Sequence, residues 1–196
     1  MISAILLAAG TSRRMGSNNK LLLPWQGKPM VAATAANLLK AGLEDIIVVT
    51  GYEAPLITAA LKTLPLHILY NPDFETGMTS SIRTGVREAT GKGYMICLAD
   101  MALITAIEYK MLIKAWEEHQ VRDGQCIGIP SYKGTNGNPI IYPKALRQAI
   151  LTHEEKDGCA EVIRKQYRHH CCIDMPTDHI LTDIDRPEQY VLLSDH

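Results

Sequence analysis

The feature that most constrains the fold is a regular alternation of short apolar runs with longer amphipathic segments. Apolar runs of about four to eight residues bounded by turn residues are typical of buried strands, and apolar residues spaced three and four apart are typical of helices. The apolar runs predict strands at residues 3–10, 45–51, 66–72, 93–101, 125–131, 138–143 and 171–175. The amphipathic segments predict helices at residues 28–40, 54–62, 79–90, 105–120 and 186–193, with a further helix near Pro143.

Capping signals mark several of these helix ends. Gly42 suits the end of the first helix, because glycine readily adopts the left-handed conformation found there. The hydroxyl residues at 79–81 are expected to cap the third helix. Thr105 and Glu108 form a capping-box pattern, and Pro143 is tolerated in the first turn of a helix.

Strands that alternate with long helices form right-handed βαβ units and a largely parallel sheet covered on both faces. The sequence therefore predicts an α/β fold. No repeat, linker or shift in composition divides the chain, so we expect a single domain over residues 1–196. Ligands of such sheets bind beyond the carboxyl ends of the strands. The predicted site lies at the loops after Ala9, Asn71, Ala99 and Pro130.

The charge balance and the apolar runs argue against two classes of partner. The formal net charge is −1 at pH 7, which gives no electrostatic support for non-specific binding to nucleic acid or a membrane surface. No apolar run approaches the roughly 20 residues that span a bilayer, and residues 1–10 lack the basic start of a signal peptide. We expect a soluble, cytoplasmic protein with neither a nucleic-acid nor a membrane partner.

The cysteines do not follow a metal or disulfide pattern. The chain has 5 cysteines and no C-x-x-C pair, so neither a disulfide framework nor a zinc site is expected. The stretch 169–172, HHCC, looks like a metal motif. Adjacent side chains of a strand point to opposite faces, however, so these four could not converge on one ion.

A small-residue turn rich in positive charge follows the first predicted strand. Residues 8–10 are small, so a ligand can approach the backbone N–H groups closely. Arg13, Arg14 and Lys20 supply charge that suits phosphate. The spacing to the next glycine matches neither a Walker loop nor a G-x-G-x-x-G motif. A basic surface turn that only favours solubility is the alternative interpretation.

The stretch LAAGTSRRMG…K at residues 7–20 resembles the signature of nucleotidyltransferases with a Rossmann-like three-layer α/β/α fold. More closely, the chain resembles the molybdenum cofactor cytidylyltransferases. The further motifs that carry the resemblance are NPDFETGMTSSIRTG at 71–85, LADM at 98–101, GTNGNPIIYP at 134–143 and DIDRPEQY at 183–190. The resemblance implies that the terminal phosphate of molybdenum-molybdopterin attacks the α-phosphate of CTP and that pyrophosphate leaves.

That reaction needs positioning and charge neutralisation rather than a strong general base, because the nucleophile is already an anion. The resemblance implies two catalytic residues, Arg14 on the β- and γ-phosphates and Lys20 at the α-phosphate. The implied nucleotide-binding residues are Leu7, Ala8, Ala9, Gly10, Thr11, Arg14, Lys20, Gly77, Met78 and Ser81, of which Ser81 would contact the pyrimidine. An ordinary capped helix is the alternative interpretation of residues 77–81.

The resemblance also implies Mg²⁺ held by Asp100 and Asp185. Asp100 ends a predicted strand, where a carboxylate can reach a metal that bridges phosphates. Strand-like alternation places Asp183 on the same face as Asp185, so Asp183 is a competing ligand. Structural alternatives are a turn capped by Asp100 and a helix capped by Asp185, with Pro187 in its first turn.

The acceptor side departs from the family pattern. Gly137 and Asn138 would reach the pterin, with a plain hairpin-like turn as the alternative. Ala102 replaces the usual proline after the metal-bearing D-M, and Asn138 replaces the usual histidine. A late D-x-G-A-R motif appears as KDGCAEV, with no arginine in register. A molybdenum hydroxylase or its maturation factor is a partner implied only by the resemblance.

Three functions therefore remain open. The first is the cytidylyltransferase. The second is a related enzyme that uses GTP or another phosphate acceptor, although a guanylyl enzyme would be expected to read LAGG where Ala9 stands here. The third is a non-catalytic protein that binds a nucleotide or a finished cofactor on the same fold.

Overall fold

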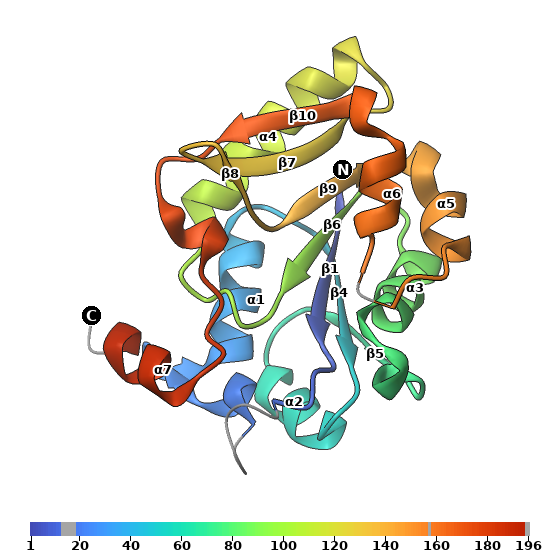
Figure 1. Cartoon of the computed structure of the whole chain (residues 1–196). Helices are drawn as coiled ribbons and strands as arrows, with labels where there is room; N and C mark the ends of the chain where they lie inside the picture. The colour runs from blue at the N-terminus through green and yellow to red at the C-terminus, as the bar shows by residue number, and fades with distance from the viewer. Residues whose placement is uncertain (13–18, 157, 195–196) are drawn as a thin grey trace.

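The computed structural model describes residues 1–12, 19–156 and 158–194 (Figure 1). Its main strands are β1 (Ser3–Ala8), β4 (Asp45–Thr50), β5 (His67–Tyr70), β6 (Gly93–Leu98), β7 (Ile127–Tyr132), β8 (Thr135–Asn136), β9 (Ile140–Pro143) and β10 (His170–Asp174). Its helices are α1 (Met30–Lys40), α2 (Ala54–Leu61), α3 (Met78–Glu88), α4 (Ala106–Arg122), α5 (Arg147–Thr152), α6 (Ala160–Lys165) and α7 (Pro187–Ser194).

Within the described ranges, these eight strands form one sheet in the order β10-β7-β9-β6-β1-β4-β5, with β8 beside β7. Strands β6, β1, β4 and β5 pair in parallel, and so do β7 and β10. Strand β9 lies between β6 and β7 and runs antiparallel to both. The predicted, mostly parallel sheet is confirmed. The antiparallel insertion of β9 is not visible in the sequence pattern, because that pattern does not set strand order.

Helices cover both faces of the sheet, as α1 and α4 lie on one side and α3, α5 and α6 on the other (Figure 1). The two apolar clusters follow the period-two alternation of the strands. In β1, Leu6 packs with Leu38 of α1 and Leu112 of α4 in one cluster. Its neighbour Ile5 belongs to the cluster of α3 and α5 on the other face. The α/β fold expected from the sequence is therefore confirmed.

Several predicted boundaries shift for local reasons. The first helix begins at Met30 rather than at residue 28, because Lys28–Pro29 forms strand β3, which pairs with β2 (Pro24–Trp25). Pro143 precedes the 3-10 turn Lys144–Leu146 instead of lying within it. The short helix α6 was not expected. The capping box of Thr105 and Glu108 is confirmed at the start of α4.

The predicted hydroxyl caps of α3 are wrong. Its N-cap is Gly77, and no side chain makes the capping hydrogen bond. The hydroxyls serve neighbouring backbone instead: Thr79 donates to the carbonyl of Glu155 at 2.5 Å, and Ser80 donates to that of Asp73 at 2.9 Å. These bonds tie the start of α3 to the segments on either side of it.

One cysteine pair departs from the expectation of no disulfides, since Cys126 and Cys171 are joined by one. The reason is tertiary: β7 and β10 are neighbouring parallel strands, and the register pairs Cys171 with Gly128, two residues after Cys126. The remaining cysteines are free, with Cys97 and Cys159 buried and Cys172 exposed. In the part of the chain that is described, no helix combines the length and apolar character needed to cross a membrane.

Candidate active site

A cleft of about 480 Å³ opens at the carboxyl ends of β1 and β6. Four segments build it: the loop after β1, the start of α3 with the preceding 3-10 turn, the loop after β6 and the chain before α7. Its lining residues are Leu7, Ala9, Gly10, Thr11, Ser12, Lys20, Leu21, Phe74, Glu75, Gly77, Met78, Ser81, Leu98, Asp100 and Asp185. The cleft lies where parallel sheets bind their ligands.

Most of the residues predicted to bind nucleotide or metal line this cleft. Ala8 does not: it is buried, and it belongs to the core cluster of α1 and α4. Arg14, together with Arg13, lies outside the described residues, so its predicted role stays a prediction. The sequence therefore located the cleft through two motifs that are about 60 positions apart.

The two glycines of the cleft differ in what they permit. Among the described residues, none has an atom within 4 Å of a Cβ placed on Gly10, so they leave the space beside it open. Gly77 has φ of +125°, and a Cβ there would lie 2.6 Å from the carbonyl oxygen of Lys156. Gly77 is thus required by the local backbone, whereas the small size of Gly10 serves the open cleft.

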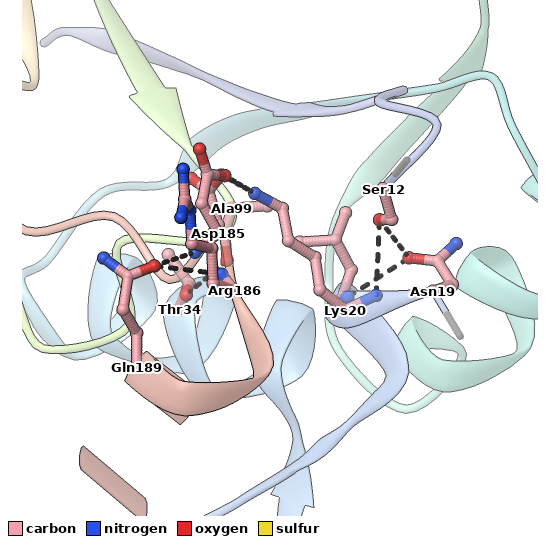
Figure 2. A network of polar contacts seen from close by, with 10 residues as sticks. Ser12, Asn19, Lys20, Thr34, Ala99, Asp185, Arg186 and Gln189 are labelled. Atoms are coloured by element: carbon pink, nitrogen blue, oxygen red, sulfur yellow. Dashed lines mark hydrogen bonds and ion pairs between the residues drawn. The ribbon is translucent and has the colours of Figure 1, made fainter. Parts of the chain in front are cut away.

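Lys20 joins the two predicted metal ligands. Its ammonium donates to Asp100 Oδ2 at 2.5 Å and also to Asp185 Oδ1. All three side chains are largely buried, with exposed fractions of 12%, 17% and 22%. Figure 2 shows the Lys20 side chain reaching from the first loop toward Asp185. The charged groups of three distant motifs thus meet at one end of the cleft.

The electrostatics of this cluster are those of carboxylates held by a cation. Burial lowers the pKa of Lys20, but the charges and hydrogen bonds of Asp100 and Asp185 outweigh it, so the pKa is raised. The pKa of Asp183 is raised as well, first by burial and then by the negative charges of Asp185 and Asp100. Lys20 therefore stays protonated in the neutral range and offsets the repulsion between the carboxylates.

The backbone at Lys20 is held in place by the turn to which this residue belongs. Asn19 caps the 3-10 helix Lys20–Leu22, because its side-chain oxygen accepts from Leu21 N at 3.1 Å. The Lys20 N–H donates to Ser12 Oγ at 3.3 Å, which links this turn back to the end of the first loop (Figure 2).

Residues 175–186, which we name the C-terminal strap, bring Asp185 into the cleft and Asp183 beside it. The strap crosses the ends of the strands, since Met175 N donates to Ser131 O at 2.8 Å and Ile184 N donates to Asp100 O at 3.1 Å. At its end, the Gln189 side chain accepts from the N–H groups of residues 185 and 186 (Figure 2). Gln189 thus satisfies two backbone N–H groups just before α7, and a capping role for the Asp185 side chain stays a prediction.

Glu108 anchors the middle of the strap. Its carboxylate accepts from Thr105 N at 2.8 Å, from Thr177 Oγ1 and from His179 Nδ1 at 3.0 Å. Burial by itself raises the pKa of Glu108, but these hydrogen bonds outweigh it and lower the pKa. The capping box of α4 therefore also positions the segment that carries Asp185 into the cleft.

The acidic residues fit a divalent metal. Asp100, Asp183 and Asp185 each offer an oxygen, and these atoms lie within 4.8 Å of one another. Asp100 Oδ1 is buried and has no hydrogen-bond partner among the residues described. Carboxylate oxygens are the ligands that Mg²⁺ prefers, so this triad could hold the ion. The sequence left open the choice between Asp183 and Asp185, and the structure brings both beside Asp100.

The two residues predicted to bind the acceptor are not among those that line the cleft. Gly137 N donates to Pro130 O at 2.8 Å, and Asn138 N donates to Ile180 O at 2.9 Å. A Cβ on Gly137 would lie 2.2 Å from the Ile180 carbonyl oxygen. Their backbone groups therefore join β7 to the C-terminal strap, and an acceptor role for either residue stays a prediction.

Sequence reasoning did not single out Phe74 and Glu75, which line the cleft just before α3. Both belong to the NPDFETG motif, so their position in it was the available signal. Asn71 of the same motif was also passed over, because its contacts with Ser80 and Ser81 depend on the fold of the loop after β5.

The chain is similar along most of its length to proteins of known name. The chain is 26% identical over 167 residues to a nicotine blue oxidoreductase of Paenarthrobacter nicotinovorans, which covers 84% of this chain and 82% of that protein. It is 27% identical over 192 residues to the molybdenum cofactor cytidylyltransferase of Escherichia coli (strain K12), covering 97% of this chain and 94% of that protein.

The fold comparison and the family comparison agree. A nucleotidyl transferase from Methanothermobacter thermautotroptrophicus superposes with a TM-score of 0.87 and 23% identity, covering 100% of this chain and 97% of that one. The family model described as "MobA-like NTP transferase domain" matches residues 4–171. This match includes the first loop, the α3 motif and Asp100, and the chain therefore belongs to the MobA-like NTP transferase family.

Proposed function

We propose that this protein is a Mg²⁺-dependent nucleotidyltransferase that transfers CMP from CTP to the terminal phosphate of molybdenum-molybdopterin and releases pyrophosphate. The observation that carries the proposal is the cluster of Lys20, Asp100 and Asp185 at one end of the cleft. The reaction needs a cation and a carboxylate set at the phosphates, next to loops that can hold a nucleoside. This cleft offers both.

In the proposed mechanism the chain mainly positions charge. The loop after β1 offers backbone N–H groups beside the open face of Gly10, where phosphates can approach closely. Lys20 donates to the transferred phosphate and stabilises the charge that builds up as pyrophosphate leaves. Asp100 and Asp185, with Asp183 beside them, would hold Mg²⁺, which supplies further charge neutralisation on the phosphates. The incoming phosphate is an anion, so no residue is required as a general base.

Two observations support CTP as the nucleotide. Ala9 lines the cleft at the position where a guanylyl enzyme would be expected to carry glycine. The chain also spans nearly all of the similar cytidylyltransferase of Escherichia coli. The product would pass to a molybdenum hydroxylase or its maturation factor in the cytoplasm.

The direct test is to incubate the purified protein with Mg²⁺, molybdenum-molybdopterin and each of CTP, GTP, ATP and UTP, and to follow pyrophosphate release. We expect release with CTP. Asp100→Asn should lower the rate by a factor of about a hundred or more, because it removes a charge at the phosphates without changing side-chain volume. The matched control is Asp174→Asn, since the Asp174 carboxylate bonds Ser131 at 2.8 Å and is not among the residues that line the cleft.

The outcomes separate the remaining alternatives. Release with GTP and not CTP would move the protein to the guanylyl branch. Nucleotide binding without pyrophosphate release would favour a different acceptor or a carrier. Equal rates for Asp100→Asn and Asp174→Asn would contradict the proposed role of the carboxylate cluster.

A second candidate is transfer of CMP to another phosphate-bearing acceptor. The observation that favours it is the placement of Gly137 and Asn138, whose N–H groups are bonded within the fold. The likeness to a protein named nicotine blue oxidoreductase also indicates that members of this sequence group act on different molecules. Pyrophosphate release that requires CTP and a cell extract, and that molybdenum-molybdopterin does not support, would favour this candidate.

A further inference from the structure

Asn71 is a buried polar residue at the edge of the cleft, with an exposed fraction of 2%. It follows β5, and its own N–H donates to Thr50 O at 2.9 Å. Its side chain points to the first turn of α3, the helix that brings Ser81 to the cleft. A buried side-chain amide must direct its NH₂ group to acceptors and its oxygen to a donor. Its orientation therefore shows which neighbouring groups accept and which donate.

The contacts of Asn71 leave only one orientation for the amide. Its Oδ1 lies 3.0 Å from the N–H of Asp73, which can only donate. The oxygen must therefore face Asp73, as in an Asx turn. The NH₂ group then faces α3, where it lies 2.9 Å from Ser80 Oγ and 3.0 Å from Ser81 Oγ.

The two serines that accept from Asn71 differ in where their own protons go. Ser80 Oγ lies 2.9 Å from the carbonyl oxygens of both Asp73 and Gly77, and either can accept its one proton. Ser81 is 4% exposed and lines the cleft, and its hydroxyl proton has no acceptor among the described residues. A hydroxyl that accepts from a fixed NH₂ group presents its proton on the other side, which here is the side of the cleft.

We propose that Asn71 is a positioning residue that fixes Ser81 as a hydrogen-bond donor toward the bound nucleotide. The inference rests on the proposed nucleotide site and deepens it. The group that Ser81 recognises is a hydrogen-bond acceptor on the base, and in CTP it is the edge formed by O2 and N3. The donor polarity comes from the loop after β5 rather than from α3 itself.

A double-mutant cycle on CTP binding tests this assignment. Dissociation constants are measured by calorimetry with CTP and Mg²⁺ and without any acceptor, so that turnover does not interfere. Ser81→Ala is expected to weaken CTP binding about tenfold, because a buried acceptor of the base loses its donor. Asn71→Asp has nearly the same shape but offers only acceptors toward Ser81. It is expected to turn the Ser81 proton away from the cleft and to weaken binding by a similar factor.

The decisive measurement is the double variant. If Asn71 acts through Ser81, then Asn71→Asp has no further effect on CTP affinity once Ser81 is alanine. If the new carboxylate merely repels the triphosphate, its effect persists in the Ser81→Ala background, and the proposal is overturned. Ser80→Ala is the matched control: it removes the neighbouring hydroxyl bonded to the same NH₂ group and should change affinity less than twofold.

Thermal melting checks that each variant folds. If Asn71→Asp does not fold, Asn71→Ala takes its place in the cycle, and its effect on affinity must likewise vanish beside Ser81→Ala. Failure of the wild-type protein to bind CTP would count against the proposed function itself. Wild-type binding that is equally strong in Ser81→Ala would leave that function intact and refute the present inference.

Discussion

The two ends of the candidate site are built in different ways. At the phosphate end, Lys20 meets Asp100 and Asp185 through side-chain charges that face a cleft. At the loop that precedes β9, Gly137 and Asn138 use their backbone N–H groups to hold the chain to Pro130 and Ile180. Both ends carry motif residues, but only those of the first end line the cleft.

The motif residues at the two ends call for different physical explanations. Packing does not explain a charged side chain held in a cleft, because the burial of charge costs free energy. Such a residue is therefore a better candidate for a functional role. A glycine whose missing Cβ makes room for a neighbouring carbonyl is explained by packing alone. The charged cluster therefore supports the proposed catalytic role at the phosphate end, whereas the packing of Gly137 is structural and an acceptor role of its loop stays a prediction.

The contrast between the two ends is tested most strongly at Lys20. Its ammonium group is paired with two carboxylates that would hold a metal. Lys20→Ala should lower pyrophosphate release by a factor of about a hundred or more, since a cation at the phosphates is lost. The same change should tighten Mn²⁺ binding about tenfold in the absence of nucleotide, because a competing charge is removed from the carboxylates. Paramagnetic resonance of free and bound Mn²⁺ measures the second effect.

Two lysine variants serve as controls for this experiment. Lys20→Arg keeps the positive charge and should leave Mn²⁺ binding as weak as in the wild type. Lys28→Ala removes an exposed lysine from β3 and should change neither reading. Weaker Mn²⁺ binding in Lys20→Ala would mean that Lys20 supports the metal site instead of competing for it.

A pair of glycine variants sharpens the contrast between the two ends. Gly137→Ala should destabilise the fold by about 1–3 kcal/mol, because the new methyl group would overlap the Ile180 carbonyl. For a chain of this size that corresponds to a fall in Tm of roughly 2–10 °C. Gly10→Ala, at a position with no atom of the described ranges within 4 Å of the new methyl group, should leave Tm nearly unchanged and weaken CTP binding. The reverse pattern, measured by thermal melting and calorimetry, would assign the ligand to the loop before β9.

The smallest expected effect concerns the anchor of the C-terminal strap. The pKa of Glu108 is lowered in the folded protein, so its contribution to stability is present above its ordinary value of 4.5 and is lost as pH falls through the folded pKa. Glu108→Gln should therefore lower Tm at pH 7 and make the decline of Tm between pH 5 and pH 3 shallower than in the wild type. The effect should be about 1 kcal/mol.

Calorimetric melts across this pH range check the prediction. Glu118→Gln, at an exposed position of the same helix, should melt with the pH dependence of the wild type. If Glu108→Gln also keeps the wild-type dependence, the strap is held by contacts other than this carboxylate.

Much of the fold followed from the sequence because its signals are local. Apolar periodicity located the strands of the sheet other than the short β8, together with the longer helices, and the capping box of α4 is confirmed at Thr105 and Glu108. The small-residue turn predicted after β1 lines one wall of the cleft. The start of α1 and the caps of α3 were wrong, because the partners of Lys28, Thr79 and Ser80 lie in other segments.

The sequence by itself therefore determined the βαβ alternation, the family and the motifs that surround the cleft. Only the tertiary structure decided that β9 runs antiparallel, that Cys126 pairs with Cys171, and that Lys20 reaches Asp185 from 165 positions away. It also decided that Asn71 presents its NH₂ group to Ser81. The physical reason is that periodicity and caps depend on neighbours along the chain, whereas these contacts depend on strand order and on how distant loops pack at the same edge of the sheet.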